Sequence, residues 1–345
     1  MSADAVPVRV AVVGAGAFGR NHLRVYRELE QAGYPVKLVA VIEPNDAARA
    51  AAEAKFGVPG FASIEACTVT VELDAASVCV PTVHHAACAQ ELMAAGVDLL
   101  IEKPVAANLA EADEIASLAR ELGRIVQVGH LERFNPAVRA VKALLNRPMF
   151  FEVHRLSIFT PRSLDVDVVL DLMIHDLDIV MKLVGKPVRE VRAVGLPVLS
   201  RKVDIANVRL EFENGCVANF TASRVSTERV RKMRFFQPHQ YLSLDFARQD
   251  LLLIDVTAAA GMDMAQLAAL ATAAAAAGGH PSAGMALTKV PVEAGEPLRL
   301  EIEAFLRAVR EQTEPVVTVE DGRAALGLAL EINASIAAHA RRTGL

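Results

Sequence analysis

The stretch Val8-Arg9-Val10-Ala11-Val12-Val13-Gly14-Ala15-Gly16-Ala17-Phe18-Gly19 decides the fold. An apolar, β-rich run leads into a glycine-rich turn, and a helical pattern follows to about Gln31. Gly14 permits the tight turn, Gly16 lets the backbone approach a pyrophosphate, and Gly19 lets the helix pack on the strand. The glycine spacing alone is a weak signal, but its place between a strand and a helix predicts a dinucleotide site.

A carboxylate, Glu43, follows the second predicted strand, Val36–Ile42. At that position a carboxylate can accept hydrogen bonds from the adenosine ribose hydroxyls and repels a 2′-phosphate. Arg49 lies close by in the sequence and would soften this discrimination. Glu43 therefore favours NAD over NADP, with an ordinary charged strand end as the alternative interpretation.

Strands and helices alternate through the first part of the chain, which predicts βαβ units and a parallel, doubly wound sheet. Asn108, followed by Glu111 three residues later, predicts a helix start, and Gly123 predicts the end of that helix. The further predicted elements are strands at Ser77–Val80, Asp98–Ile101 and Ile125–Val128 and helices at Asp46–Phe56, Ala86–Ala95 and Asn108–Leu122. We expect residues 1–129 to form this α/β Rossmann domain.

The pattern changes after Gly129. Longer strand-like runs follow one helix, and Glu213-Asn214-Gly215 predicts a hairpin between two of them. These predicted elements are the helix Pro136–Leu145 and strands at Phe150–Ser157, Val188–Gly195, Ile205–Glu213, Cys216–Ser223 and Tyr241–Asp245. We expect residues 130–345 to form an α+β domain with a large, mainly antiparallel open sheet. Helices at about 300–340 are expected to pack back toward the first domain.

Composition excludes several classes of protein. The net charge of −5 and the pI near 6.0 argue against nucleic-acid binding, which requires a basic surface. The four cysteines form no C-x-x-C pair and no His cluster has zinc spacing, so no metal site is expected. The Ala-rich segment Thr257–Gly279 is interrupted by polar residues, so we expect a surface helix or mobile loop there and no membrane span. The N-terminus has no signal pattern, so we expect a cytoplasmic protein.

A second motif, Glu102-Lys103-Pro104, follows the strand Asp98–Ile101. Together with the glycine-rich turn and the run Val80-Pro81-Thr82-Val83-His84-His85, it resembles the Gfo/Idh/MocA oxidoreductase family over nearly the whole chain. The resemblance implies that Lys103 sits at the nicotinamide and touches the reacting hydroxyl. It also implies cofactor contacts by Pro81, Thr82, His85 and Glu102, although the family often has Asn where this chain has Thr82. Without the resemblance, Lys103 would be an ordinary surface lysine paired with Glu102.

A third motif is Asp171-Leu172-Met173-Ile174-His175. On a helix, residues four apart share a face, and Asp178 and Lys182 would continue the same stripe. Such a stripe is usually the wet face of an amphipathic helix. The family resemblance instead implies a catalytic pair, in which Asp171 orients His175 and His175 takes the hydroxyl proton as hydride leaves. The sequence leaves open whether His175 or Lys103 is the final base.

The stretches Gly129–Pro136 and Asp165–Asp178 resemble one subgroup of the family, the enzymes that oxidise the 3-hydroxyl of UDP-N-acetylglucosamine for lipid A biosynthesis. A nucleotide-sugar needs cations for its diphosphate, and the planar guanidinium of Arg suits two oxygens. The candidate diphosphate ligands are Arg133, Arg155, Arg162 and Arg224, each of which is equally well explained as a structural charge.

Other functions stay open at this point. The substrate can be another sugar, a UDP-sugar acid or an inositol. A non-catalytic NAD-binding regulator would need neither Lys103 nor the Asp171/His175 pair, and a biliverdin-reductase-like enzyme would not require that pair either. The resemblance implies a homodimer or homotetramer formed through the exposed face of the C-terminal sheet.

Overall fold

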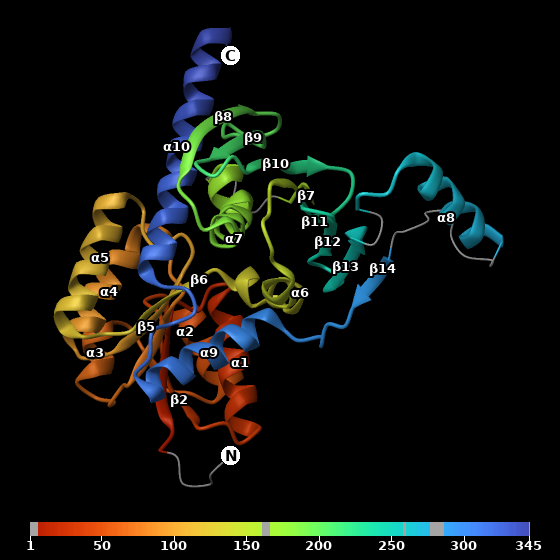
Figure 1. The fold of residues 1–345 in the computed structure, drawn as a ribbon. Helices are drawn as coiled ribbons and strands as arrows, with labels where there is room; N and C mark the ends of the chain where they lie inside the picture. The colour runs from red at the N-terminus through yellow and green to blue at the C-terminus, as the bar shows by residue number, and fades with distance from the viewer. Residues whose placement is uncertain (1–5, 161–165, 258–259, 277–285, 345) are drawn as a thin grey trace. The chain divides into compact units, whose positions relative to one another are not determined.

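The structure is a computed structural model that describes residues 6–160, 166–257, 260–276 and 286–344 (Figure 1). The chain divides into two units that are not contiguous in sequence. The first unit comprises Met1–Phe134 and Gly295–Leu328, and the second comprises Asn135–Ala294 and Ala329–Leu345. Each unit is built on its own sheet.

The first unit contains a six-stranded sheet in the order β3-β2-β1-β4-β5-β6, and every strand pair is parallel. Its strands are β1 (Val8–Val13), β2 (Val36–Ile42), β3 (Gly60–Phe61), β4 (Ala75–Val78), β5 (Asp98–Glu102) and β6 (Val126–Gly129). The strand order reverses between β1 and β4, and sheets of this kind bind ligands at the carboxyl ends of the strands at that point. The predicted Rossmann sheet is confirmed.

Helices connect these strands: α1 (Gly19–Gln31), α2 (Asp46–Phe56), α3 (Ile64–Thr68), α4 (His85–Ala94) and α5 (Leu109–Leu122), with short 3₁₀ turns η1 (Thr82–His84) and η2 (Leu131–Phe134). The predicted start of α5 is confirmed, because the Asn108 side chain accepts a hydrogen bond from the Glu111 N–H at 3.0 Å. The helix ends at Gly123, whose φ of 61° is left-handed and suits glycine.

A late segment of the chain completes the core of the first unit. Helix α9 (Pro297–Glu311) packs on α1 and β1, and its apolar face joins a buried cluster that includes Val10, Leu23 and Tyr26. The buried residues contributed by α9 are Leu298, Ile302, Phe305, Leu306 and Val309. Burial of these side chains stabilises the unit by roughly 1.5–3 kcal/mol per residue.

The second unit contains an eight-stranded sheet in the order β14-β13-β12-β11-β7-β10-β9-β8. Only β7 and β10 run parallel, and all other pairs are antiparallel, so the predicted, mainly antiparallel sheet is confirmed. The strands are β7 (Phe150–Ile158), β8 (Val188–Leu196), β9 (Ile205–Phe212), β10 (Val217–Ser226), β11 (Val230–Gln237), β12 (Gln240–Asp245), β13 (Asp250–Asp255) and β14 (Ala286–Val290). Strands β11, β13 and β14 are not among the predicted strands.

The predicted hairpin joins β9 to β10. Gly215 has a φ of 79°, and the Asn214 side chain accepts a hydrogen bond from the Cys216 N–H at 3.1 Å. The alternating burial along β9 and β10 places one face of the sheet in the core, where α7 (Ile174–Val184) is also largely buried.

The remaining helices of the second unit are α6 (Pro136–Val141), the 3₁₀ turn η3 (Lys142–Leu144), the π-helical turn η4 (Val169–Met173) and α8 (Met264–Ala276). The last helix, α10 (Val319–Thr343), contains the boundary between the two units. Helix α8 lies in the Ala-rich segment and has exposed or half-buried side chains where they are described. Among the described residues, no helix has the length and apolar character that crossing a bilayer requires.

Candidate functional site

The glycine-rich turn has the geometry that the motif predicts. Gly14 has a φ of 94°, and a Cβ there would lie 2.8 Å from the Cys79 carbonyl oxygen at the end of β4. A Cβ at Gly19 would lie 1.9 Å from the Gly14 carbonyl oxygen, so only glycine lets α1 approach the turn. A Cβ at Gly16, by contrast, would meet no described protein atom within 4 Å. The open side of Gly16 fits a turn whose backbone faces a ligand.

Glu43 is fixed against this turn. Its carboxylate accepts hydrogen bonds from the Ala15 N–H at 2.8 Å and from the Asn45 N–H at 3.0 Å. The Arg49 guanidinium donates to the Glu43 carbonyl oxygen at 2.8 Å and also pairs with Asp46. The carboxylate is therefore held in place beside the turn, and part of the Arg49 guanidinium is occupied by neighbouring groups.

A cavity of about 660 Å³ opens at the carboxyl ends of β1, β2 and β4. Its lining includes Gly14, Gly16 and Glu43, together with Ile64 and Pro81. The cavity lies at the point where the strand order reverses, which is where this class of sheet binds a dinucleotide. Its mainly apolar lining, with the Glu43 carboxylate beside the glycine-rich turn, suits the adenosine half of NAD.

Two cysteines, Cys79 and Cys88, line the same cavity. Burial raises the pKa of each thiol, and the neighbouring charge of Glu102 adds to the rise at Cys79. Both thiols are therefore protonated at neutral pH, as expected for inert buried cysteines.

The loop after β4 and the loop after β5 are joined through His85. Its Nδ1 lies 3.0 Å from the Pro104 carbonyl oxygen and its Nε2 lies 3.0 Å from the Val80 carbonyl oxygen. Burial lowers the pKa of His85, although both carbonyl contacts oppose that shift. A neutral imidazole has one N–H, so it donates to one of these carbonyls at a time. Pro81 and Thr82 lie on the same loop, between Val80 and His85.

Lys103 directly follows Glu102, the last residue of β5, and lies at the carboxyl edge of the sheet. The Glu102 side chain is buried and contacts His22 of α1, whose Nε2 lies 2.9 Å from the Glu102 carboxylate. Glu102 thus belongs to the interior of the unit, and Lys103 belongs to the edge at which the cofactor cavity opens.

The helix with the third motif begins as a π turn. Asp171 lies in η4, and His175 lies in the first turn of α7. The Asp167 carboxylate caps the turn by accepting hydrogen bonds from the Val169 and Leu170 N–H groups at 2.9 and 3.0 Å. His175 and Asp178 are buried, so this stripe is not a simple wet face. Single π turns inside helices occur frequently at functional sites.

Arg155, a candidate diphosphate ligand, forms a buried ion pair with Asp176 of α7. Its Nε and Nη2 donate to the two carboxylate oxygens at 2.8 and 2.7 Å, and the two side chains are only 5% and 3% exposed. The guanidinium also lies over the Phe246 ring, 5.3 Å from its centroid. This two-pronged pair joins β7 to the residue next to His175.

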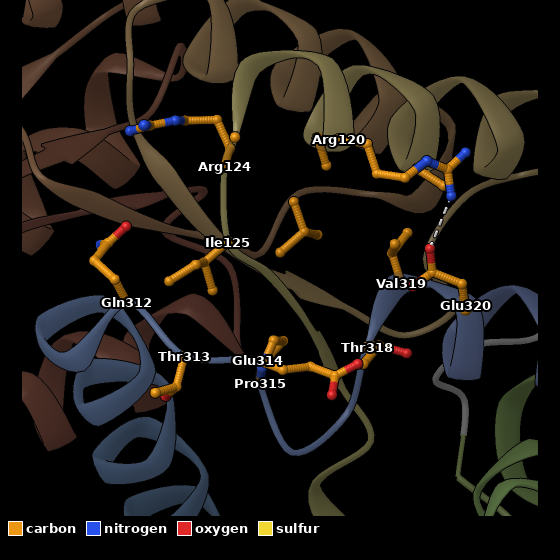
Figure 2. Close-up of a pocket in the computed structure, with 14 residues that line it drawn as sticks. Arg120, Arg124, Ile125, Gln312, Thr313, Glu314, Pro315, Thr318, Val319 and Glu320 are labelled. Carbon is orange, nitrogen blue, oxygen red and sulfur yellow. Dashed lines mark hydrogen bonds and ion pairs between the residues drawn. The ribbon is translucent and has the colours of Figure 1, made fainter.

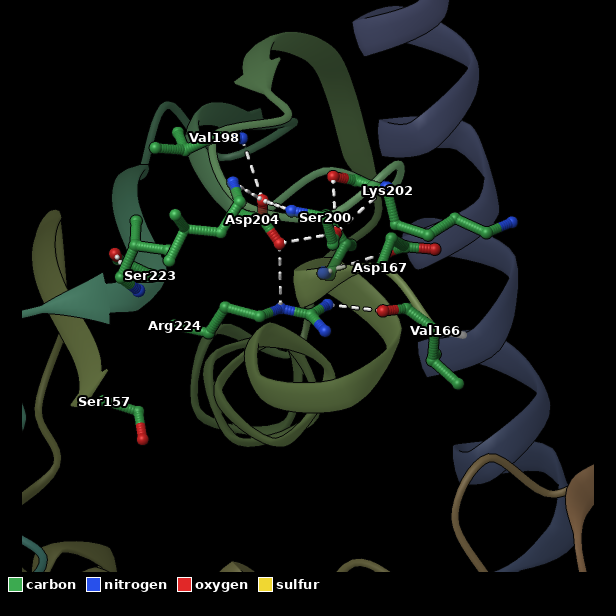
Figure 3. Close-up of polar contacts among 12 residues, drawn as sticks. Ser157, Val166, Asp167, Val198, Ser200, Lys202, Asp204, Ser223 and Arg224 are labelled. Carbon is green, nitrogen blue, oxygen red and sulfur yellow. Dashed lines mark hydrogen bonds and ion pairs between the residues drawn. The ribbon is translucent and has the colours of Figure 1, made fainter. Parts of the chain in front are cut away.

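Arg224, a second candidate, contacts the segment just before η4. It donates to the Val166 carbonyl oxygen and lies 3.6 Å from the Asp204 carboxylate, with both side chains buried (Figure 3). Although burial opposes ionisation, hydrogen bonds from the Ser200 N–H and hydroxyl and from the Leu199 and Val198 N–H groups lower the pKa of Asp204 to about 2. Asp204 is therefore a stable anion beside Arg224.

The other two arginine candidates differ in what the structure describes. Arg133, in η2, lies 3.3 Å from Asp321 at the start of α10, within the first unit. Arg162 lies outside the described residues. A substrate contact by any of the four arginines remains a proposal, and three of them have a carboxylate neighbour in their own unit.

A second hollow in the first unit is not a dinucleotide site. It has a volume of about 350 Å³, lies between the segment Gly123–Val126 and the segment Gln312–Glu320, and includes the ion pair Arg120–Glu320 at 3.1 Å (Figure 2). Because Val126 begins β6, this hollow lies at the amino ends of the parallel strands. Dinucleotides bind at the opposite, carboxyl edge.

Several buried charged residues around the motifs were not predicted from the sequence. Asp176, Asp204 and Glu301 are at most 2% exposed, and His22 is fully buried. The spacing of His22 three residues after Gly19 places it on the first turn of α1, but no local pattern reveals its partner Glu102, which lies 80 residues away. No group of three or more potential metal ligands occurs among the residues described.

Comparison with known proteins agrees with this architecture. Residues 8–130 match the sequence profile of the oxidoreductase family with an NAD-binding Rossmann fold, and residues 137–237 match that of the GFO/IDH/MocA C-terminal domain. The UDP-N-acetylglucosamine 3-dehydrogenase of Acidithiobacillus ferrooxidans is 34% identical over 98% of this chain and 100% of its own length. An inositol 2-dehydrogenase of Leifsonia xyli is 30% identical over 53% of this chain and 56% of its own length.

Solved structures show the same fold. The A. ferrooxidans enzyme superposes with a TM-score of 0.84 at 32% identity, covering 97% of this chain and 99% of that one. An Agrobacterium radiobacter oxidoreductase, solved with NAD+, L-tartaric acid and magnesium, has a TM-score of 0.80 at 15% identity and covers 96% and 97% of the two chains. With its Rossmann sheet and its full-length match, this chain belongs to the Gfo/Idh/MocA oxidoreductase family of NAD(P)-dependent dehydrogenases that act on CH–OH groups.

Proposed function

We propose that the protein oxidises the 3-hydroxyl of UDP-N-acetylglucosamine to a ketone, with NAD as the hydride acceptor. The full-length similarity to the A. ferrooxidans UDP-N-acetylglucosamine 3-dehydrogenase carries this proposal, because it extends through both units. The sequence matches to inositol 2-dehydrogenases cover between 52% and 64% of the chain. The product, a 3-keto sugar, is a substrate for amination, which is consistent with a role in making 3-amino sugars for lipid A.

The preference for NAD over NADP rests on Glu43. Its carboxylate is held by the Ala15 and Asn45 N–H groups, and Glu43 lines the cavity beside the glycine-rich turn. A carboxylate in this position binds the ribose hydroxyls and repels a 2′-phosphate. The Arg49 guanidinium is hydrogen bonded to the Glu43 carbonyl oxygen, which supports NAD as the cofactor.

Three residues are proposed to handle the proton. Lys103 contacts the reacting hydroxyl, His175 takes its proton, and Asp171 orients the imidazole and stabilises its charged form. When bound, NAD supplies the chemistry of hydride acceptance at the nicotinamide ring. The buried position of His175 and the capped π turn that leads into α7 fix the backbone that carries this imidazole. Lys103 is the alternative final base.

The test is turnover with a panel of UDP-sugars and polyols, followed as NADH absorbance, with mass spectrometry of the product. We expect NADH only with UDP-N-acetylglucosamine and a product that is lighter by two hydrogens. A panel in which myo-inositol or UDP-N-acetylglucosaminuronate alone supports NADH formation contradicts the substrate assignment. NAD binding without turnover of any sugar or polyol would instead indicate a non-catalytic regulator.

A further inference from the structure

A buried chain of four polar side chains connects α1, β4 and β5 in the first unit. The Tyr26 hydroxyl lies 2.8 Å from the Ser77 hydroxyl, the Ser77 hydroxyl lies 3.1 Å from Nδ1 of His22, and Nε2 of His22 lies 2.9 Å from the Glu102 carboxylate. Tyr26, Ser77 and His22 are fully buried, and Glu102 is 7% exposed. Buried polar groups are costly unless each has its partner, so the direction of these hydrogen bonds matters.

Only one direction of hydrogen-bond donation gives every donor among these four side chains an acceptor. Burial raises the pKa of Tyr26, so its hydroxyl keeps its proton, and Ser77 is the sole acceptor available to it among the described residues. The Ser77 proton must then point to Nδ1 of His22, which places the imidazole proton on Nε2. Nε2–H donates to Glu102, which therefore accepts as a carboxylate. The reverse direction would leave the Tyr26 hydroxyl with no acceptor in the described part of the chain.

Other titratable groups face Glu102 from the neighbouring elements. These are Cys79 at the end of β4, His85 of α4 and Glu301 of α9, together with His22 of α1. Glu301 is fully buried, and neither of its carboxyl oxygens has a hydrogen-bond partner among the described residues. Burial and the charge of Glu102 raise the pKa of Glu301 well above its ordinary value, so Glu301 is a neutral acid. Glu102 is thus the anion of this cluster.

This series of hydrogen-bonded side chains connects the segment after the glycine-rich turn to the Glu102-Lys103-Pro104 motif. His22 lies one turn after Gly19, the last glycine of the turn that faces the cofactor cavity. Glu102 is the last residue of β5 and is bonded directly to Lys103. A Cβ at Gly129 of β6 would lie 2.9 Å from the Glu102 carboxyl carbon, so the side chain is confined on that side as well. His22 therefore links the glycine-rich turn and α1 to the residue next to Lys103.

We propose that His22 is a positioning residue for the dehydrogenase reaction, and that it acts by holding Glu102 as an ionised carboxylate beside Lys103. Tyr26 donates to Ser77, and Ser77 donates to Nδ1 of His22. The imidazole proton is therefore on Nε2, which donates to Glu102. The inference depends on dehydrogenase chemistry at Lys103 and is independent of which sugar or polyol is the substrate.

The first test compares His22→Leu with His22→Gln, using whichever substrate gives NADH. Without the donor, the Glu102 carboxylate loses the partner that holds it in place, so we expect kcat of His22→Leu to fall about 10- to 100-fold and its pH profile to differ from that of the native protein. The amide N–H of His22→Gln can still reach Glu102, so that variant should recover part of the loss. KM for NAD should change less than kcat in both. A pH profile of His22→Leu that coincides with that of the native protein overturns the proposal.

A second test needs neither substrate nor variant. ¹⁵N NMR of histidine-labelled native protein reports which ring nitrogen carries the proton, and we expect His22 to be neutral with its proton on Nε2. An imidazolium signal, or a proton on Nδ1, overturns the proposal even if the variants fail to fold. Failure of UDP-N-acetylglucosamine as substrate would leave this result unchanged, so the two proposals fail separately.

Glu301→Gln is the matched control for charge. Since Glu301 is a neutral acid in the fold, the neutral amide should leave kcat within about twofold of the native value at each pH. If Glu301 were ionised, kcat of the variant would differ from the native value at neutral pH. Ionisation of Glu301 favours the unfolded chain at pH values above the ordinary pKa of Glu. We therefore expect the melting temperature of the variant to exceed that of the native protein by a margin that grows as the pH rises from about 4 to 7.

Discussion

The two units differ in how their polar residues are used. In the first unit, the glycine-rich turn presents backbone atoms to the cavity, and the Ala15 and Asn45 N–H groups hold the Glu43 carboxylate in place. In the second unit, the diphosphate candidates Arg155 and Arg224 each lie against a buried aspartate, Asp176 and Asp204. A binding site made of backbone can be inferred from a short motif, but a charged side chain has several possible partners until the fold is known.

The largest expected effect separates catalysis from cofactor binding. We predict that His175→Ala reduces turnover by about 10²- to 10⁴-fold because proton transfer loses its acceptor, while NAD affinity stays within about twofold. Lys103→Met should also reduce turnover. Steady-state kinetics measures turnover, and titration with NAD measures the affinity for the cofactor. Of His175→Ala and Lys103→Met, the variant whose pH profile of kcat/KM loses its acidic limb identifies the final base. Unchanged turnover in His175→Ala would exclude His175 from the mechanism.

The next effect concerns the stability of the second unit. Arg155→Met leaves the Asp176 carboxylate without its two-pronged partner, and breaking a buried pair in this way costs about 3–5 kcal/mol. Urea unfolding followed by circular dichroism measures the loss. The double variant Arg155→Met/Asp176→Leu should recover most of it, because the buried charge is gone. A loss below about 1 kcal/mol in the single variant would mean that this pair does not anchor α7.

A smaller effect is expected at the cofactor cavity. Removing a charged hydrogen-bonding group costs about 1.5–3 kcal/mol, so Glu43→Ala should weaken NAD binding by about 10- to 100-fold and narrow the preference over NADP. Glu43→Gln keeps the shape and removes the charge, so it should restore part of the NAD affinity but none of the discrimination. Isothermal titration with both cofactors measures this, and equal affinities of the native protein for NAD and NADP would refute the role of Glu43.

The smallest effect depends on pH. Because the pKa of Asp204 is about 2 in the fold and about 3.9 in an unfolded chain, its charge contributes about 2 kcal/mol of stability at pH values above about 4. That contribution is lost as the pH falls from about 4 to 2. Unfolding free energies of native protein and Asp204→Asn should therefore differ most near neutrality and converge toward pH 2. A difference that is constant with pH would show that the carboxylate charge is not what holds the Val198–Ser200 loop.

Sequence patterns predict most of the N-terminal sheet and its helices, since each motif there is local, but not β3, α3 or the membership of α9 in the first unit. Asn108 caps α5, and the three glycines have the backbone geometry that the motif requires. The sheet of the second unit is predicted in kind, but β11, β13 and β14 were not recognised. In β11 three of the four exposed residues, Arg231, Lys232 and Arg234, are basic, and this charge obscures the strand pattern of the buried residues Met233 and Phe235.

The π turn and the buried ion pairs could not be predicted for a different reason. Helical spacing places Asp171 and His175 on one face whether the turn is α or π, so the pattern is the same for both. The partners Arg155–Asp176 and Arg224–Asp204 lie about 20 residues apart on different elements. Such pairings depend on strand register, which local sequence does not determine.

Helix α9 has a consequence for biosynthesis. The side of the Rossmann sheet nearest α1 receives Leu298, Ile302 and Phe305 from a segment that leaves the ribosome after the whole second sheet. Until then, nascent residues 1–134 carry an uncovered apolar strip, so the nucleotide-binding half, although translated first, cannot finish folding first. Chaperone engagement and misfolding are therefore expected to concentrate in the interval between synthesis of Phe134 and synthesis of Val309.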